Sequence, residues 1–192
     1  MNTIHYRVNK IPNNLMESLV FLLKQLDRET FLHSMRVGEM LYKFGLFLNL
    51  PQYQIEQLHL IGYLHDIGKI SVPSTILTKC DPLTDSEREN IKKHGIIGYH
   101  LLLPYITNNE ILNAIRYHHE NLDGSGYEGL VDNQIDFNTR LVRIVDSFDC
   151  MINKRCYKSK MSVDNSLNEL LSLSGTVYDS HLVNEFVNFI KI

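Results

Sequence analysis

The stretch ETFLHSMRVGEMLYKFGLFL, residues 29–48, decides the fold class of this chain. Its apolar side chains recur mostly three or four residues apart: Phe31, Met35, Val37, Leu41 and Phe44. That spacing gathers them on one face of an α-helix, whereas a half-buried strand would need strict alternation of apolar and polar residues. The stretch therefore predicts a long amphipathic helix.

Helical periodicity continues through most of the chain. We expect further helices over 12–26, 51–66, 84–103, 108–120, 138–153, 162–174 and 180–190, with a loop over 71–79. Thr84 and Glu87 fit a capping box, and Asp179 fits the N-cap of the last helix. The sequence predicts an all-α fold of about seven to nine helices. We expect one domain over 1–192, with 1–28 as a helical extension packed on it.

Composition and charge exclude several classes of protein. Apolar residues make up 44% and charged residues 21% of the chain, as in ordinary globular domains. A net charge of −3 argues against a DNA or RNA duplex as partner, because such binders are usually basic. An anionic substrate must therefore meet local positive charge or metal. No apolar run approaches the ~20 residues of a membrane span, and no secretion signal is visible, so we expect a cytoplasmic protein.

The three cysteines, Cys80, Cys150 and Cys156, include no CxxC pair. They predict reduced thiols rather than a disulfide framework or a thiolate zinc site.

Histidine and carboxylate residues form the most informative pattern, because nine histidines is an unusually high number for this length. The candidate metal ligands are Glu29, His33, His65, Asp66, His94, His118, His119 and Asp146. Each alone would be unremarkable, as we expect for His5, His59, His100 and His181. Their combination on successive helices predicts a metal centre in the core, with imidazole and carboxylate ligands suited to iron, manganese or zinc.

Local spacing constrains how these side chains could meet. Glu29 and His33 are four residues apart and share a helix face. His65 and Asp66 are adjacent, as are His118 and His119, and neighbouring side chains on a regular helix diverge by about 100°. Each adjacent pair can reach one centre only where its helix ends or distorts. The following DGSGYEG, residues 123–129, predicts an ordered loop whose amides can approach a ligand closely.

Several motifs together resemble the HD-GYP family of the HD metal-dependent phosphohydrolases. HDIGK at 65–69 resembles the superfamily signature, and HHENLDGSGYE at 118–128 resembles HHExxDGSGYP. HSMRV at 33–37, the 83–94 segment, RIVDSFD at 143–149 and RCY at 155–157 resemble other family motifs in the family's order. The resemblance covers about residues 27–190. Glu128 replaces the proline of GYP, Cys150 an alanine and Cys156 a proline.

The resemblance implies a metal-dependent cyclic di-GMP phosphodiesterase that acts in signalling. It implies two or three divalent ions, usually iron or manganese, on the candidate ligands named above, with Asp66 as a bridge. Glu29 occupies the position that marks three-metal members. The implied reaction is attack of a metal-bridging hydroxide on phosphorus, giving pGpG, with GMP as a further product left open.

The resemblance also assigns roles around the metal centre. Asp66 and Lys69 are the implied catalytic residues, and the implied substrate contacts are Lys69, Gly126, Tyr127, Arg155 and Lys158. Two other readings stay open: a phosphohydrolase of another cyclic dinucleotide or nucleotide, and a non-catalytic cyclic-dinucleotide-binding module. A homodimer through apolar residues 15–23 is also left open, and the sequence indicates no regulatory partner.

Overall fold

The computed structural model describes residues 21, 25, 27–153 and 160–192. The helix expected over 12–26, the extension expected over 1–28 for the most part, and Arg155, Cys156 and Lys158 lie outside these residues.

Helices form most of the described part of the chain. Their order is α2 (Arg28–Phe47), α3 (Gln52–Leu64), η1 (Ile67–Ser71), α4 (Ser74–Leu77), α5 (Asp85–Lys92), α6 (His94–Leu102), α7 (Asn109–Tyr117), η2 (Asp132–Gln134), α8 (Phe137–Ile152), α9 (Val163–Ser172) and α10 (Ser180–Ile190). Within the described ranges, β-pairing is limited to isolated bridges such as Asp123 with Val131. The all-α prediction is confirmed.

The predicted helix starts agree with the observed caps. The Thr84 side chain accepts from the Glu87 amide, and the Glu87 carboxylate accepts from the Thr84 amide, which completes the capping box. Asp179 accepts from the amides of His181 and Leu182 at the start of α10. Both side chains satisfy amides that have no partner within the first helical turn.

Two of the predicted elements were wrong. The single helix expected over 84–103 is two helices, α5 and α6, because Lys93 adopts a turn-like ψ of −11° between them. The break makes His94 the first residue of α6. The loop expected over 71–79 contains the short helix α4, which follows Pro73, whose φ of −54° suits a helix start.

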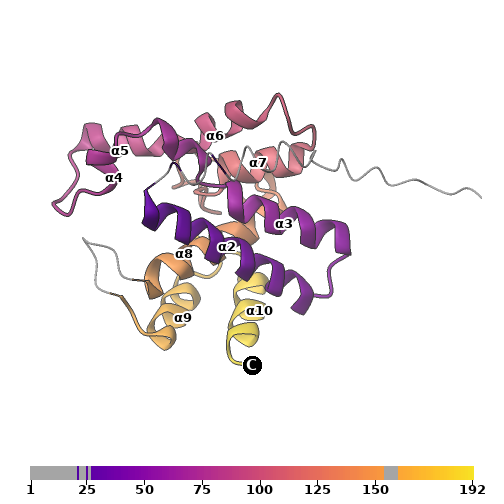
Figure 1. The fold of residues 1–192 in the computed structure, drawn as a ribbon. Coiled ribbons are helices and arrows are strands. Elements are labelled where there is room, and N and C mark those ends of the chain that lie inside the picture. The colour runs from indigo at the N-terminus through magenta and orange to yellow at the C-terminus, as the bar shows by residue number, and fades with distance from the viewer. Residues whose placement is uncertain (1–20, 22–24, 26, 154–159) are drawn as a thin grey trace, which may run out of the picture.

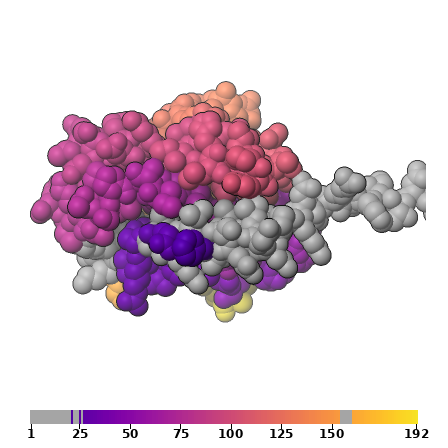
Figure 2. All heavy atoms as spheres, turned by 45° about the horizontal axis from the view of Figure 1, so that its top comes forward, coloured from indigo at the N-terminus to yellow at the C-terminus, as the bar shows by residue number. Residues whose placement is uncertain are grey.

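The helices pack around α2 and α8. In Figure 1, α2 and α3 lie side by side, and α8 lies behind α2. Helices α9 and α10 pack against each other and against α8. Helix α6 packs against α7 and against η1. The space-filling view shows the segments from α4 to α7 gathered on one side of the molecule and α10 at the opposite edge (Figure 2). No helix among the described residues has both the length and the apolar character to cross a bilayer.

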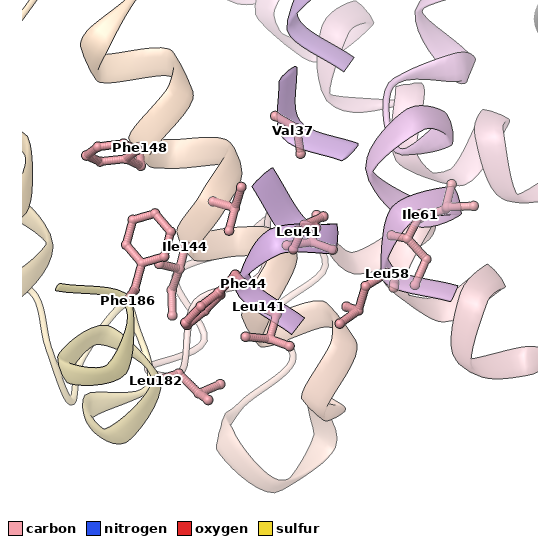
Figure 3. Close-up of a cluster of buried hydrophobic side chains, with 14 of the residues drawn as sticks. Val37, Leu41, Phe44, Leu58, Ile61, Leu141, Ile144, Phe148, Leu182 and Phe186 are labelled. Carbon is pink, nitrogen blue, oxygen red and sulfur yellow. The ribbon is translucent and has the colours of Figure 1, made fainter. Parts of the chain in front are cut away.

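The apolar core lies between α2, α3, α8 and α10. Figure 3 shows side chains from these four helices pointing toward one another: Val37, Leu41, Phe44, Leu58, Ile61, Leu141, Ile144, Phe148, Leu182 and Phe186. The ring of Phe186 contacts those of Phe44 and Phe148 edge to face, each at 5.1 Å between centroids. This core fixes α2 and α8 relative to each other, and both helices also carry candidate ligands, His33 in the first half of α2 and Asp146 in the middle of α8.

Gly68 brings η1 close to the start of α6. A side-chain carbon at this position would lie 2.6 Å from the Gly98 amide nitrogen and would overlap the His94 backbone. Only glycine allows that approach, which places the end of α3 beside His94.

Candidate metal centre

The candidate ligands come from the ends of several helices and from the middle of α8. His33 lies in α2, His94 begins α6 and Asp146 lies in α8. Helix α3 ends at Leu64, so His65 and Asp66 stand at the turn into η1. Helix α7 ends at Tyr117, just before His118 and His119. Both adjacent pairs therefore sit where a helix ends, as the sequence required for them to converge.

The seven residues lie together and are largely buried. All except His119, which is partly buried, belong to the interior: His33, His65, Asp66, His94, His118 and Asp146. Among the described residues, their ligand atoms form convergent groups, one of His94, His118 and His119 and another of His33, His65 and Asp66. The cluster could hold divalent metal.

Asp66 connects the two groups through its two carboxylate oxygens. Its Oδ1 lies 3.3 Å from His94 Nε2 and 3.9 Å from His118 Nε2. Its Oδ2 faces the other way, 3.4 Å from His65 Nε2 and 3.7 Å from His33 Nε2. One carboxylate is thus placed to serve both groups.

Backbone carbonyls fix the tautomer of three of the imidazoles. Nδ1–H of His65 donates to the Gly62 carbonyl at 2.7 Å, and His118 donates in the same way to Ile115 at 2.8 Å. His94 Nδ1 lies 2.6 Å from the Ile91 carbonyl oxygen. Since a neutral imidazole carries one proton, each Nε2 presents a lone pair to the cluster, as a metal ligand must.

Burial keeps the imidazoles of His94, His118 and His119 neutral. It lowers the pKa of His94 to about 4. It also holds the pKa of His118 and of His119 well below the usual range, and the neighbouring imidazoles add to that effect. The three rings are therefore in the form that binds metal.

The donor set fits a cation on geometric grounds. His94 Nε2 and His118 Nε2 are only 3.0 Å apart, although both present lone pairs. Two nitrogens bound at a right angle to one ion, each about 2.1 Å from it, would be about 3.0 Å apart. Asp66 Oδ1 is buried and accepts no hydrogen bond from the described residues. A buried carboxylate oxygen beside two lone pairs is costly unless a positive ion lies among them.

His33 has a different arrangement, which the sequence reasoning missed. Its Nδ1 lies 2.7 Å from Asp149 Oδ2, and Arg36 binds the same carboxylate with two N–H groups at 2.8 and 2.9 Å. Burial alone would lower the pKa of His33, but hydrogen bonds with Asp146 and Asp149 outweigh it and raise the pKa to about 9. Metal binding at His33 therefore requires loss of a proton. A carboxylate behind a histidine in this way orients the ring toward a metal.

Lys69 lies beside the shared carboxylate. Its Nζ is 2.6 Å from Asp66 Oδ2, and its side chain is 13% exposed. Burial would raise the pKa of Asp66, but Lys69 and the surrounding histidines hold it well below the usual range. Lys69 is thus a cation at the margin of the cluster.

Glu29 is not brought into either group. It lies one turn before His33 in α2 with an exposed side chain, and its amide donates to the N-cap residue Asp27. The structure places it on the predicted helix face without adding it to the convergent groups.

The loop after His119 lies against the cluster. The Tyr127 ring lies over the His119 ring, with 4.6 Å between centroids and 33° between planes. A side chain at Gly126 would approach the Glu120 Cα to 2.5 Å, so at this point the loop packs tightly against the backbone of Glu120. The buried Glu120 carboxylate accepts from the amides of Glu128 and Leu130, both at 2.7 Å. Tyr127 is therefore held as a wall of the site, with its exposed part available to a ligand.

Glu128 ties this loop to α7. Its carboxylate binds Arg116 at 2.6 Å and 3.0 Å through two N–H groups. The Arg116 guanidinium also lies 4.9 Å from the Tyr117 ring centroid. An ion pair thus anchors the loop at the position where the related motif has a proline.

We expect Glu128→Ala to raise KM about fivefold for a substrate of this site and to leave kcat unchanged. The reason is that one partly exposed ion pair contributes up to about 1 kcal/mol to holding the loop. Steady-state kinetics check this, with the exposed Glu56→Ala as the matched control. An unchanged KM would show that Glu128 does not position the loop.

Comparison with known proteins places the chain in a family. The sequence model of the HD domain family matches residues 10–182. A Thermotoga maritima protein named cyclic di-GMP phosphodiesterase is 34% identical over 182 residues, which cover 92% of this chain and 49% of the relative. A Vibrio cholerae protein named 3'3'-cGAMP-specific phosphodiesterase 1 is 34% identical over 140 residues, covering 72% of this chain and 32% of the relative.

A solved structure agrees at the level of the fold. The HD domain of the phosphodiesterase PgpH from L. monocytogenes, in complex with cyclic-di-AMP, matches with a TM-score of 0.68 over 90% of this chain and 93% of that chain, at 14% identity. The chain therefore belongs to the HD domain family, and its relatives confirm the HD-GYP resemblance. It spans about half the length of the first of these relatives and less of the second.

Proposed function

We propose that this chain is a metal-dependent phosphodiesterase that hydrolyses cyclic di-GMP to pGpG. One observation carries the proposal: the buried Asp66 carboxylate faces two groups of histidines, with no hydrogen bond from the described residues to its Oδ1. That arrangement suits two divalent ions sharing one carboxylate. The relatives named as cyclic dinucleotide phosphodiesterases support the choice of substrate.

The proposed ligands are His33, His65, Asp66, His94, His118, His119 and Asp146, holding iron or manganese, with zinc as the alternative. When bound, divalent ions stabilise negative charge on the phosphodiester and make a bound water more acidic. The residues of the chain would hold these ions and fix their positions. Four of the five histidines are held in a single tautomer, because the Nδ1 atoms of His65, His94 and His118 are engaged by carbonyls and that of His33 by Asp149.

Substrate contacts surround the proposed ions. We assign Lys69 to a phosphoryl oxygen, because it is the cation beside Asp66 and its charge can offset charge that builds during hydrolysis. Tyr127 offers a ring surface to a guanine base beside His119. Gly126 lets the loop backbone approach that base. Arg155 and Lys158 stay sequence-based proposals for the second phosphate, since they lie outside the described residues.

Glu29 stays a proposed ligand of a third ion. Because one carboxylate would be lost from that ion, we expect Glu29→Ala to lower the metal content by about one ion per chain. Elemental analysis of the purified variant beside the wild type checks this. An unchanged metal content would limit the centre to two ions.

A substrate panel tests the proposed reaction. The metal-loaded chain is incubated separately with cyclic di-GMP, 3'3'-cGAMP and cyclic di-AMP, and the products are separated by chromatography. We expect cyclic di-GMP to be opened fastest. Faster turnover of 3'3'-cGAMP would favour the second candidate, a mixed-dinucleotide phosphodiesterase, which the Vibrio cholerae relative supports. Tight binding of cyclic di-GMP without turnover would favour a non-catalytic binding module.

A further inference from the structure

Cys150 lies where its sulfur faces the candidate ligands. It stands one turn after Asp146 in α8, so the two side chains share a helix face. Its Sγ is 3.3 Å from Asp146 Oδ1. With His33 and Asp146 it forms another group whose ligand atoms all lie within 4.8 Å of one another. The candidate site therefore contains a sulfur donor, although the sequence predicted imidazole and carboxylate ligands alone.

The position of His33 connects this group to the rest of the cluster. Asp149 engages His33 Nδ1, which leaves Nε2 to bind a metal ion. That Nε2 lies 3.0 Å from Asp146 Oδ1 and 3.3 Å from His65 Nε2. One nitrogen binds one ion, so the group with Cys150 and the group with His65 share a single metal position.

The separations suit ligands of one ion. A nitrogen about 2.1 Å and a sulfur about 2.3 Å from the same ion lie at most about 4.4 Å apart. Side-chain movements of a few tenths of an ångström bring the observed group within that limit. Cys150 is only partly buried, so its side chain has room for such a movement.

We propose that Cys150 is a sulfur ligand of the metal ion at the His33 side of the cluster, beside Asp146. This proposal rests on the proposed metal centre. Cysteine binds metal as the thiolate, a soft ligand that favours iron and zinc over manganese. The two sides of Asp66 would then differ in chemistry: imidazole nitrogens alone face Oδ1, whereas sulfur joins the ligands on the Oδ2 side.

Cobalt(II) substitution tests the proposal without relying on turnover. The full chain is loaded with cobalt, its metal content is measured, and its near-ultraviolet absorption is recorded. A sulfur-to-cobalt charge-transfer band is expected in the wild type and in the control Cys80→Ala, because Cys80 is exposed and outside the groups. The band is expected to disappear in Cys150→Ala and Cys150→Ser, with at least a tenfold loss of affinity for one ion, on the order expected for a lost metal contact.

The outcomes separate the two proposals. The wild type could bind cobalt without showing the band, or Cys150→Ala could bind cobalt and keep the band. Either result would overturn the role of Cys150 and leave the metal centre intact. Failure to bind cobalt would overturn the metal centre itself. Alkylation of the wild type, followed by peptide mass spectrometry, gives a second readout that needs no variant. Metal is expected to protect Cys150 and not Cys80, and equal labelling with and without metal would contradict coordination.

Discussion

Asp66→Ala is expected to abolish phosphodiesterase turnover and to remove the bound metal at the same time. The two oxygens of the Asp66 carboxylate face different groups of histidines, with Oδ1 at 3.3 Å from His94 Nε2 and Oδ2 at 3.4 Å from His65 Nε2. Its loss removes a negatively charged ligand from each proposed ion. It also leaves buried histidines without the anion that they face.

The experiment measures metal content and turnover on the same preparation. Asp66→Asn has nearly the same size and keeps one oxygen, but it lacks the charge that two ions would share, so we expect the same double loss. The exposed Asp81→Ala is the matched control and should retain both properties. Circular dichroism separates loss of metal from loss of fold. A folded Asp66→Ala that keeps its full metal content would contradict the assigned role.

Lys69→Ala is expected to retain the metal and to lower kcat on the order of 10²-fold or more, the scale of one lost charge donor to a transition state. Lys69 binds Asp66 through a salt bridge of 2.6 Å, and its protonated ammonium group has no lone pair to offer a metal ion. Removing it should therefore affect the substrate more than the ions. The exposed Lys43→Ala serves as the control for the loss of one positive charge.

The kinetic split decides the role of Lys69. A fall in kcat with unchanged metal content supports contact with the reacting phosphodiester. A loss of metal comparable to that of Asp66→Ala would instead show that Lys69 positions the Asp66 carboxylate for metal binding. Lys69→Arg retains the charge in a wider, planar group, so we expect it to recover only part of the rate.

Local sequence rules predicted much of the fold because they act within one or two helical turns. The capping pair at Thr84 and Glu87 was predictable because each side chain satisfies the other's amide. A helix end near each adjacent ligand pair was predictable because adjacent ligands cannot converge from a regular helix, although the expected helices over 51–66 and 108–120 ran two and three residues too far. The break at Lys93 was not predictable in this way, since it depends on the packing of α6 against η1 and α7.

The hydrogen bonds and ion pairs that orient the candidate ligands and the loop beside them join distant parts of the chain. Asp149 lies 116 residues from His33 in the sequence, and no local pattern joins them. The available signals were its place in RIVDSFD, residues 143–149, and its position three residues after Asp146 on the same face of α8. The anchor between Arg116 and Glu128 was hidden for the same reason, because a replaced proline does not indicate its new partner.

In the proposed function, the cluster around Asp66 holds the ions that drive hydrolysis. The most direct test of this role is metal-to-protein stoichiometry on anaerobically purified chain, with cyclic di-GMP turnover assayed by chromatography on the same sample before and after chelation. We expect at least about two ions per chain together with pGpG, both lost on chelation and both restored by iron or manganese. Undiminished turnover after complete metal removal, or no metal uptake during reconstitution, would contradict that role.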